Sequence, residues 1–128
     1  MASLEGGLAF QKGLGAVHAM SHPLGGLRAP ILHHGTLNAV FLPAVLRFNA
    51  ESAAQKFETL RATMDGDPAQ IIMELNQRLG LPASLGDMDV PDAIFPEIAE
   101  AAAKDYCTAT NPRPATAADY RVLLEESF

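Results

Sequence analysis

All four histidines of this 128-residue chain lie within its first 34 residues. They are His18, His22, His33 and His34. His18 and His22 are four residues apart, a spacing that places two imidazoles on the same face of a helix. Such a pair alone is more often packed or solvated than metal-binding. A third histidine that returns through a Gly/Pro-rich loop favours a transition-metal site, because neutral imidazole suits zinc, iron, nickel and copper.

Other residues that could do chemistry form no comparable pattern. Cys107 is the only cysteine and has no histidine near it in the sequence, which favours a small buried residue over a nucleophile. The glycines near positions 14 and 25 match no phosphate-binding motif and are better suited to sharp turns and close helix packing. A small metal-dependent hydrolase would need a carboxylate ligand and a general base, for which Glu5, Asp105 and Asp119 are the candidates.

The elements that must position the histidines are helical, because apolar residues recur at helical spacing and no long run alternates apolar with polar residues. The pattern predicts helices at residues 3–21, 36–48, 49–64, 68–79 and 89–104, and from 116 to the C-terminus. Pro23 is expected to end the first of these, Asn49 to cap the third, and Asp67 and Thr116 to cap the fourth and the last. We therefore expect one all-α domain over residues 1–128, a bundle of about six helices.

The composition limits the classes of function. The net charge is −6 and the nine Lys and Arg residues are scattered, which disfavours nucleic-acid binding. The longest apolar stretch, 39–46, is far shorter than the roughly 20 residues that span a bilayer, so no membrane association is expected. The first residues lack the basic region of a signal peptide, and a single cysteine suits a reducing compartment. These features predict a cytoplasmic protein.

Two stretches resemble the signature of the iron-containing alcohol dehydrogenase family. The first runs from Gly13 to Gly26 and the second from His34 to Pro43. The tail, with Asp105-Tyr106-Cys107 and Asn111-Pro112-Arg113, is similar to the end of that family, so the resemblance covers essentially the whole chain. It implies the helical C-terminal domain of the dehydroquinate synthase-like fold. Enzymes of this kind also carry an N-terminal nucleotide-binding domain, which the sequence is expected to lack.

The resemblance also implies a chemistry. His18 and His34 would be two ligands of Fe2+ or Zn2+, and His22 would be the catalytic histidine that handles the proton. The intact enzyme would interconvert an alcohol and an aldehyde or ketone with NAD(P), the metal acting as a Lewis acid. The family's other two ligands lie in the upstream domain. The chain alone is therefore expected to be inactive, to expose apolar surface where that domain docks, and to form a homo-oligomer.

Two alternatives stay open. Gly35 and Asn38 follow His34 as the signature requires, which favours His34 as the ligand. His33 could replace it or donate a hydrogen bond from beside the site. The alternative to a dehydrogenase domain is a stand-alone helical module for binding or assembly that carries a vestigial metal site.

Overall fold

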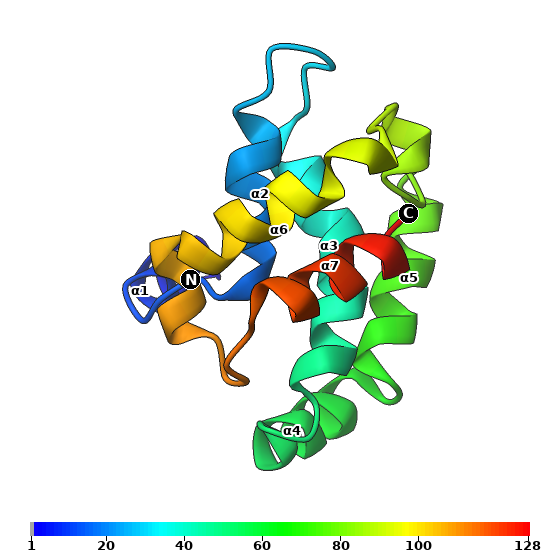
Figure 1. The fold of residues 1–128 in the computed structure, drawn as a ribbon. Helices are drawn as coiled ribbons and strands as arrows, with labels where there is room; N and C mark the ends of the chain where they lie inside the picture. The colour runs from blue at the N-terminus through cyan, green and yellow to red at the C-terminus, as the bar shows by residue number, and fades with distance from the viewer. Residues whose placement is uncertain (1) are drawn as a thin grey trace.

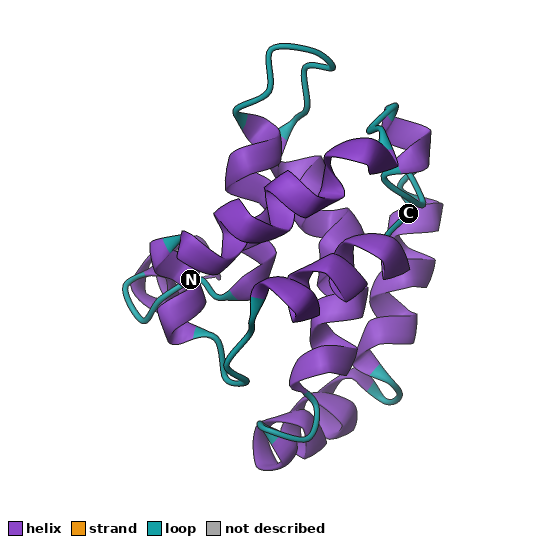
Figure 2. Cartoon of the chain, viewed as in Figure 1, coloured by secondary structure: helices purple, strands orange, loops and turns teal. Residues whose placement is uncertain are grey.

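The computed structural model describes residues 2–128, which form helices joined by loops without any strand (Figures 1 and 2). The seven α-helices of this part are α1 (Ala2–Phe10), α2 (Ala16–Gly25), α3 (His34–Asn49), α4 (Ala54–Met64), α5 (Pro68–Arg78), α6 (Phe95–Lys104) and α7 (Ala117–Glu126). The short 3-10 helices are η1 (Gly86–Met88), η2 (Asp92–Ile94) and η3 (Tyr106–Thr110). The all-α prediction is confirmed, with one more α-helix than expected.

The additional helix arises because the first predicted helix is broken. Gly13 and Gly15 have φ values of +104° and +76°, a backbone conformation that only glycine adopts readily and that no helix allows. A Cβ at Gly13 would lie 2.3 Å from the Thr110 side chain, and one at Gly15 would lie 2.9 Å from Asn111 Oδ1. The prediction of one helix over 3–21 is therefore wrong, because these glycines turn the chain and let η3 approach it.

The expectation that Pro23 ends the helix is also wrong, since α2 continues to Gly25. Pro23 lies in the last turn, where its missing N–H removes a single helical hydrogen bond. The Gly26 N–H donates to the His22 carbonyl over 3.1 Å and completes the final turn. His22 consequently keeps its helical register with His18.

Asn49 does not cap a helix that runs to Met64. It is the last residue of α3, and α4 begins five residues later at Ala54. The side chain of Asn49 faces Asn111 instead, which removes it from any capping role. Of the α4 residues only Phe57 is buried, so this helix contributes little to the core.

Two predicted caps are confirmed. Asp67 Oδ1 accepts the Gln70 N–H over 3.0 Å at the start of α5. Thr116 Oγ1 accepts the Asp119 N–H over 3.2 Å, and the Asp119 carboxylate accepts the Thr116 N–H over 2.8 Å. This reciprocal capping box begins α7.

The predicted start of a helix at Asp89 is six residues too early. Asp89 has a φ of +58°, which a helix cannot contain, and the turn η2 separates it from α6. Pro96 lies in the first turn of α6, where a missing N–H costs no helical hydrogen bond.

Helices α2, α3, α6 and α7 surround one core (Figure 1). Helix α6 packs against α2 and α7, while α3 packs against α2, α5 and α7. The largest fully buried side chains are Tyr120, Phe41, Phe95 and Met20. Helix α1 instead leaves Leu4, Leu8 and Phe10 more than half exposed. From residue 2 onward, no helix has the length and apolar character needed to cross a bilayer.

Asn111 joins three parts of the chain. Its Oδ1 accepts the Ala16 N–H over 3.1 Å, a donor in the first turn of α2 that has no helical partner. The same oxygen accepts from Asn49 Nδ2 over 3.1 Å, and Asn111 Nδ2 donates to Asn49 Oδ1 over 2.8 Å. One side chain directly after η3 thus fixes the start of α2 and the end of α3.

We expect Asn111→Ala to lower the free energy of unfolding by about 1–3 kcal/mol, because it leaves the Asn49 amide and the Ala16 N–H without partners. Asn49→Ala should also destabilise the chain. The double variant should lower the free energy of unfolding by less than the sum of the two single variants, since both remove the same amide pair. Urea unfolding followed by circular dichroism measures all three, and strictly additive costs would contradict the coupling.

Candidate metal centre

Three of the four imidazoles converge between α2, which carries His18 and His22, and the start of α3, which carries His34. The ring centroids of His18 and His34 lie 5.2 Å apart, those of His22 and His34 5.6 Å, and those of His18 and His22 5.8 Å. Helices α2 and α3 pack directly against each other. The three predicted site histidines are therefore brought together by the packing of two helices.

The burial pattern of α2 decides which way its histidines face. Ala16, Met20 and Leu24 are buried in the core, at a spacing of four residues along the helix. His18 and His22 lie between them in sequence and are only partly buried. Because a helix turns 100° per residue, burial of the first set places the histidines toward solvent and toward the start of α3.

Asn38 lies between two of the imidazoles. Its Nδ2 is 3.2 Å from Nε2 of His18 and 3.2 Å from Nε2 of His34. An amide NH2 group has two hydrogens, so it can donate to both ring nitrogens, each of which then presents a lone pair. Asn38 Oδ1 is buried and has no hydrogen-bond partner. The two lone pairs are thus directed at one common point.

This arrangement fits a divalent transition metal. Two imidazole nitrogens that face the same point are the donors that Fe2+ and Zn2+ accept, and both carry their lone pairs there. Asn38 Oδ1, on the same side chain, is a buried polar atom without a hydrogen-bond partner, which is unusual in a folded protein. Two imidazoles do not complete even a four-coordinate site, so a metal held here would need further ligands from other residues.

His33 turns away from this cluster. It occupies the N-cap position of α3, and its Nδ1 lies 3.3 Å from Thr36 Oγ1. Its Cε1 lies 3.2 Å from the position that a Cβ at Gly35 would take, so the ring covers the first turn of its own helix. Of the adjacent pair, His34 is the histidine that joins His18 and His22.

The surroundings of His18 favour its neutral form. Burial lowers the pKa of His18, and charge repulsion from His34 and His22 lowers it further, against a smaller opposing effect of Asp105. Neutral imidazole is the form that binds metals. The lowered pKa of His18 thus favours the form that a metal could use.

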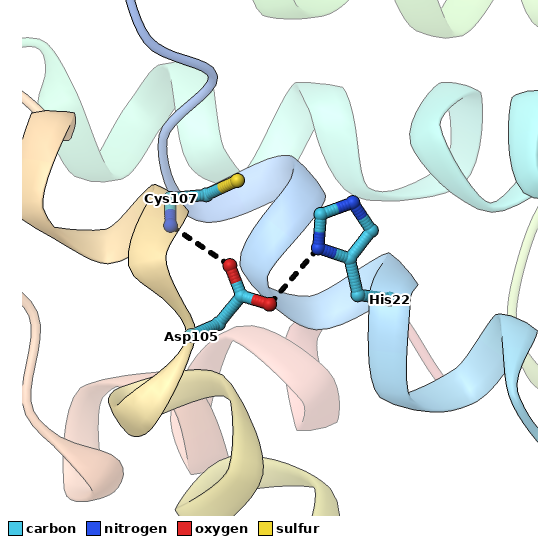
Figure 3. Close-up of side chains that lie close together, drawn as sticks. All are labelled: His22, Asp105 and Cys107. Carbon is cyan, nitrogen blue, oxygen red and sulfur yellow. Dashed lines mark hydrogen bonds and ion pairs between the residues drawn. The ribbon is translucent and has the colours of Figure 1, made fainter.

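Asp105 contacts His22 from the end of α6. Its Oδ2 lies 2.9 Å from His22 Nδ1, and its Oδ1 accepts the Cys107 N–H over 2.8 Å (Figure 3). Burial raises the pKa of Asp105, but the hydrogen bonds from the Cys107 N–H and from His22 outweigh it and hold the pKa below its usual value. The sequence pointed to Asp105 only as a hydrolase candidate, because its partner is 83 residues away and no local pattern links them.

The other two carboxylates considered for a hydrolase are placed differently. Asp119 belongs to the capping box of α7, and Glu5 is exposed on α1. Among the described residues, the one group of three with ligand atoms within 4.8 Å of each other is His22, Asp105 and Cys107. In this group Asp105 already uses both oxygens as hydrogen-bond acceptors.

The fold and the histidine cluster define a helical domain with a candidate metal centre near its surface. Over residues 1–128 the chain matches the C-terminal part of the Fe-containing alcohol dehydrogenase family, and it belongs to that family. The resemblance inferred from the histidine and glycine motifs is thereby confirmed.

Curated relatives agree with this assignment. The chain is 50% identical over 138 residues to 4-hydroxybutyrate dehydrogenase of Cupriavidus necator, covering 99% of this chain and 36% of that protein. It is 35% identical to lactaldehyde reductase of Escherichia coli strain K12, covering 95% and 35%. The chain thus spans about a third of the length of these relatives.

Solved structures give the same result for the fold. A crystal structure of 1,3-propanediol oxidoreductase superposes with a TM-score of 0.82 at 33% identity, covering 90% of this chain and 33% of that one. Maleylacetate reductase from Agrobacterium tumefaciens superposes with a TM-score of 0.75 at 30% identity, covering 91% and 32%. The prediction of the family's helical C-terminal domain is confirmed.

We expect Cys107 to be an unreactive thiol. It is 1% exposed, and burial, followed by its hydrogen bond with Asp105, raises its pKa. Since the thiolate is the reactive form, alkylation by iodoacetamide at neutral pH should be at least about tenfold slower in the folded chain than in urea. Mass spectrometry would follow the modification, and equal rates in both states would contradict a buried structural role.

Proposed function

We propose that this chain is the metal-binding third of an NAD(P)-dependent alcohol dehydrogenase that interconverts an alcohol and an aldehyde or ketone. The observation that carries the proposal is the approach of the His18 and His34 Nε2 atoms to one amide nitrogen, each over 3.2 Å. The family supports an iron-type enzyme, and the dehydrogenase and reductase names of the relatives support redox chemistry at an alcohol or carbonyl carbon.

In this proposal His18 and His34 are metal ligands, and His22 handles the proton beside them. Bound Fe2+ or Zn2+ would supply Lewis acidity that stabilises an alkoxide or polarises a carbonyl. The His22 ring lies 5.6 Å from that of His34, close enough to face a substrate oxygen held at the centre. Before a cation binds, the Asn38 amide lies at the point toward which the two ligand rings face.

The remaining ligands and the nicotinamide belong, in this proposal, to a nucleotide-binding domain that corresponds to the other two thirds of the relatives' length. Two imidazoles leave coordination positions open, and no hydride acceptor can be positioned without a nucleotide site. We therefore propose that the chain is inactive by itself. The exposed apolar side chains of α1 support docking of such a domain or assembly into a homo-oligomer.

Zn2+ titration of the isolated chain tests the ligand assignment. We expect weak binding, because only two protein ligands are present, and at least about tenfold weaker binding in His18→Ala and His34→Ala. His33→Ala is the matched control, since it removes the neighbouring imidazole that faces Thr36, and it should leave the affinity essentially unchanged. Isothermal titration calorimetry gives the four binding constants, for the wild type and the three variants, and a greater loss of affinity in His33→Ala than in His34→Ala would reverse the assignment.

A chimera tests the activity. We replace the matching third of the Cupriavidus necator 4-hydroxybutyrate dehydrogenase with this chain and follow the absorbance of reduced nicotinamide. The chimera should oxidise 4-hydroxybutyrate, whereas the chain alone should not. In the chimera, His22→Ala should lower kcat by about 10²-fold or more, because a proton-transfer group is lost, while the bound metal is retained.

A folded chimera that binds metal but lacks dehydrogenase activity would refute the proposed function. That result would favour a helical module for binding or assembly with a vestigial site. If kcat stayed undiminished in His22→Ala, the proposed dehydrogenase activity would still hold, but the proton-transfer role proposed for His22 would be refuted.

A further inference from the structure

We infer that Asp105 is a positioning residue that fixes His22 in the tautomer with its proton on Nδ1, so that Nε2 presents a lone pair to the metal centre. The inference rests on the role proposed for His22 and adds the residue that sets its orientation. The relevant contact is the 2.9 Å distance between His22 Nδ1 and Asp105 Oδ2.

The carboxylate decides the tautomer because it can only accept. An ionised Asp105 has no hydrogen to give, so the ring nitrogen that faces it must carry one. In a neutral imidazole the other nitrogen, Nε2, then has the lone pair. A histidine that takes a proton from a substrate hydroxyl needs this arrangement.

Asp105 is itself held in place. Its Oδ1 accepts the Cys107 N–H over 2.8 Å and so caps η3, and its side chain is only 15% exposed. The His22 ring stacks with the rings of His34 and Tyr106, at 5.6 and 5.9 Å and interplanar angles of 13° and 28°. Stacking sets the plane of the ring, and the bond to Asp105 sets its rotation within that plane.

A metal ion held by His22, Asp105 and Cys107 is the competing interpretation of these residues. Both Asp105 oxygens already accept hydrogen bonds, one from the ring and one from the Cys107 backbone (Figure 3). The Cys107 side chain is buried, and its thiol has a raised pKa, which disfavours the thiolate that a metal requires. The geometry therefore favours an oriented histidine over a second metal site.

Asp105→Asn gives a sharp test because the Cys107 N–H dictates how the amide must lie. The amide oxygen is needed to accept that N–H, which leaves the NH2 group facing His22 Nδ1. Nδ1 must then accept, and the proton moves to Nε2. The substitution keeps the size of the side chain and the cap of η3, and it inverts the tautomer.

The measurement is 15N NMR of the His22 ring in the 128-residue chain, at alkaline pH where imidazoles are neutral. We expect protonation at Nδ1 in the wild type and in Asp105→Glu, and at Nε2 in Asp105→Asn. Asp67→Asn is the matched control, since it changes the capping carboxylate of α5 and should leave His22 unaffected. A Cys107 amide that stays protected from hydrogen exchange in Asp105→Asn would show that η3 is intact.

Wild-type His22 with its proton on Nε2, or a tautomer that stays the same in Asp105→Asn, would overturn the inference. If added Zn2+ changed the His22 tautomer and at the same time broke the contacts of Asp105, the three-residue metal site would be favoured and the inference would be overturned as well. Failure of the proposed function is a separate result: His34→Ala would not weaken Zn2+ binding, while the tautomer would still invert in Asp105→Asn.

Discussion

The placement of α2 depends on one short segment, residues 105–111, which contacts the helix at both ends. Asp105 bonds to His22 in the last turn, and Asn111 accepts the Ala16 N–H in the first. Helix η3 lies between these two residues and is capped by Asp105. Because both contacts are directional, α2 can neither slide nor rotate without breaking one of them. Gly13 and Gly15 make this possible by leaving room for Thr110 and Asn111.

Core packing supplies the second constraint on the site. Leu37 and Phe41 are fully buried on α3, four residues apart, and His34 and Asn38 share the same spacing on a neighbouring face. On α2 the buried residues Ala16, Met20 and Leu24 are likewise spaced by four, so the packing of the two helices brings their polar faces together at one edge. The residues that stabilise the core and those that form the histidine cluster are thus set by the same helical period.

The features that could be predicted from sequence are the local ones. The His18–His22 spacing, the cap at Asp67 and the capping box at Thr116 depend on neighbours within four residues, and all of them are present in the structure. The break between α1 and α2 depends on a segment about 95 residues further along, so helical periodicity alone suggested one continuous helix. For the same reason the sequence does not predict the pairing of His22 with Asp105, since nothing near either residue indicates the other.

Asn38 donates to two of the clustered imidazoles, those of His18 and His34. The imidazoles of His18, His22 and His34 lie close together where α2 packs against α3. The Asn38 amide uses the same two Nε2 lone pairs that a cation would use. If the proposed ion binds there, the amide loses both acceptors, and leaving such a group unsatisfied costs about 1–3 kcal/mol. Asn38 would therefore have to reorient, and its unpartnered Oδ1 is the atom that could gain a partner.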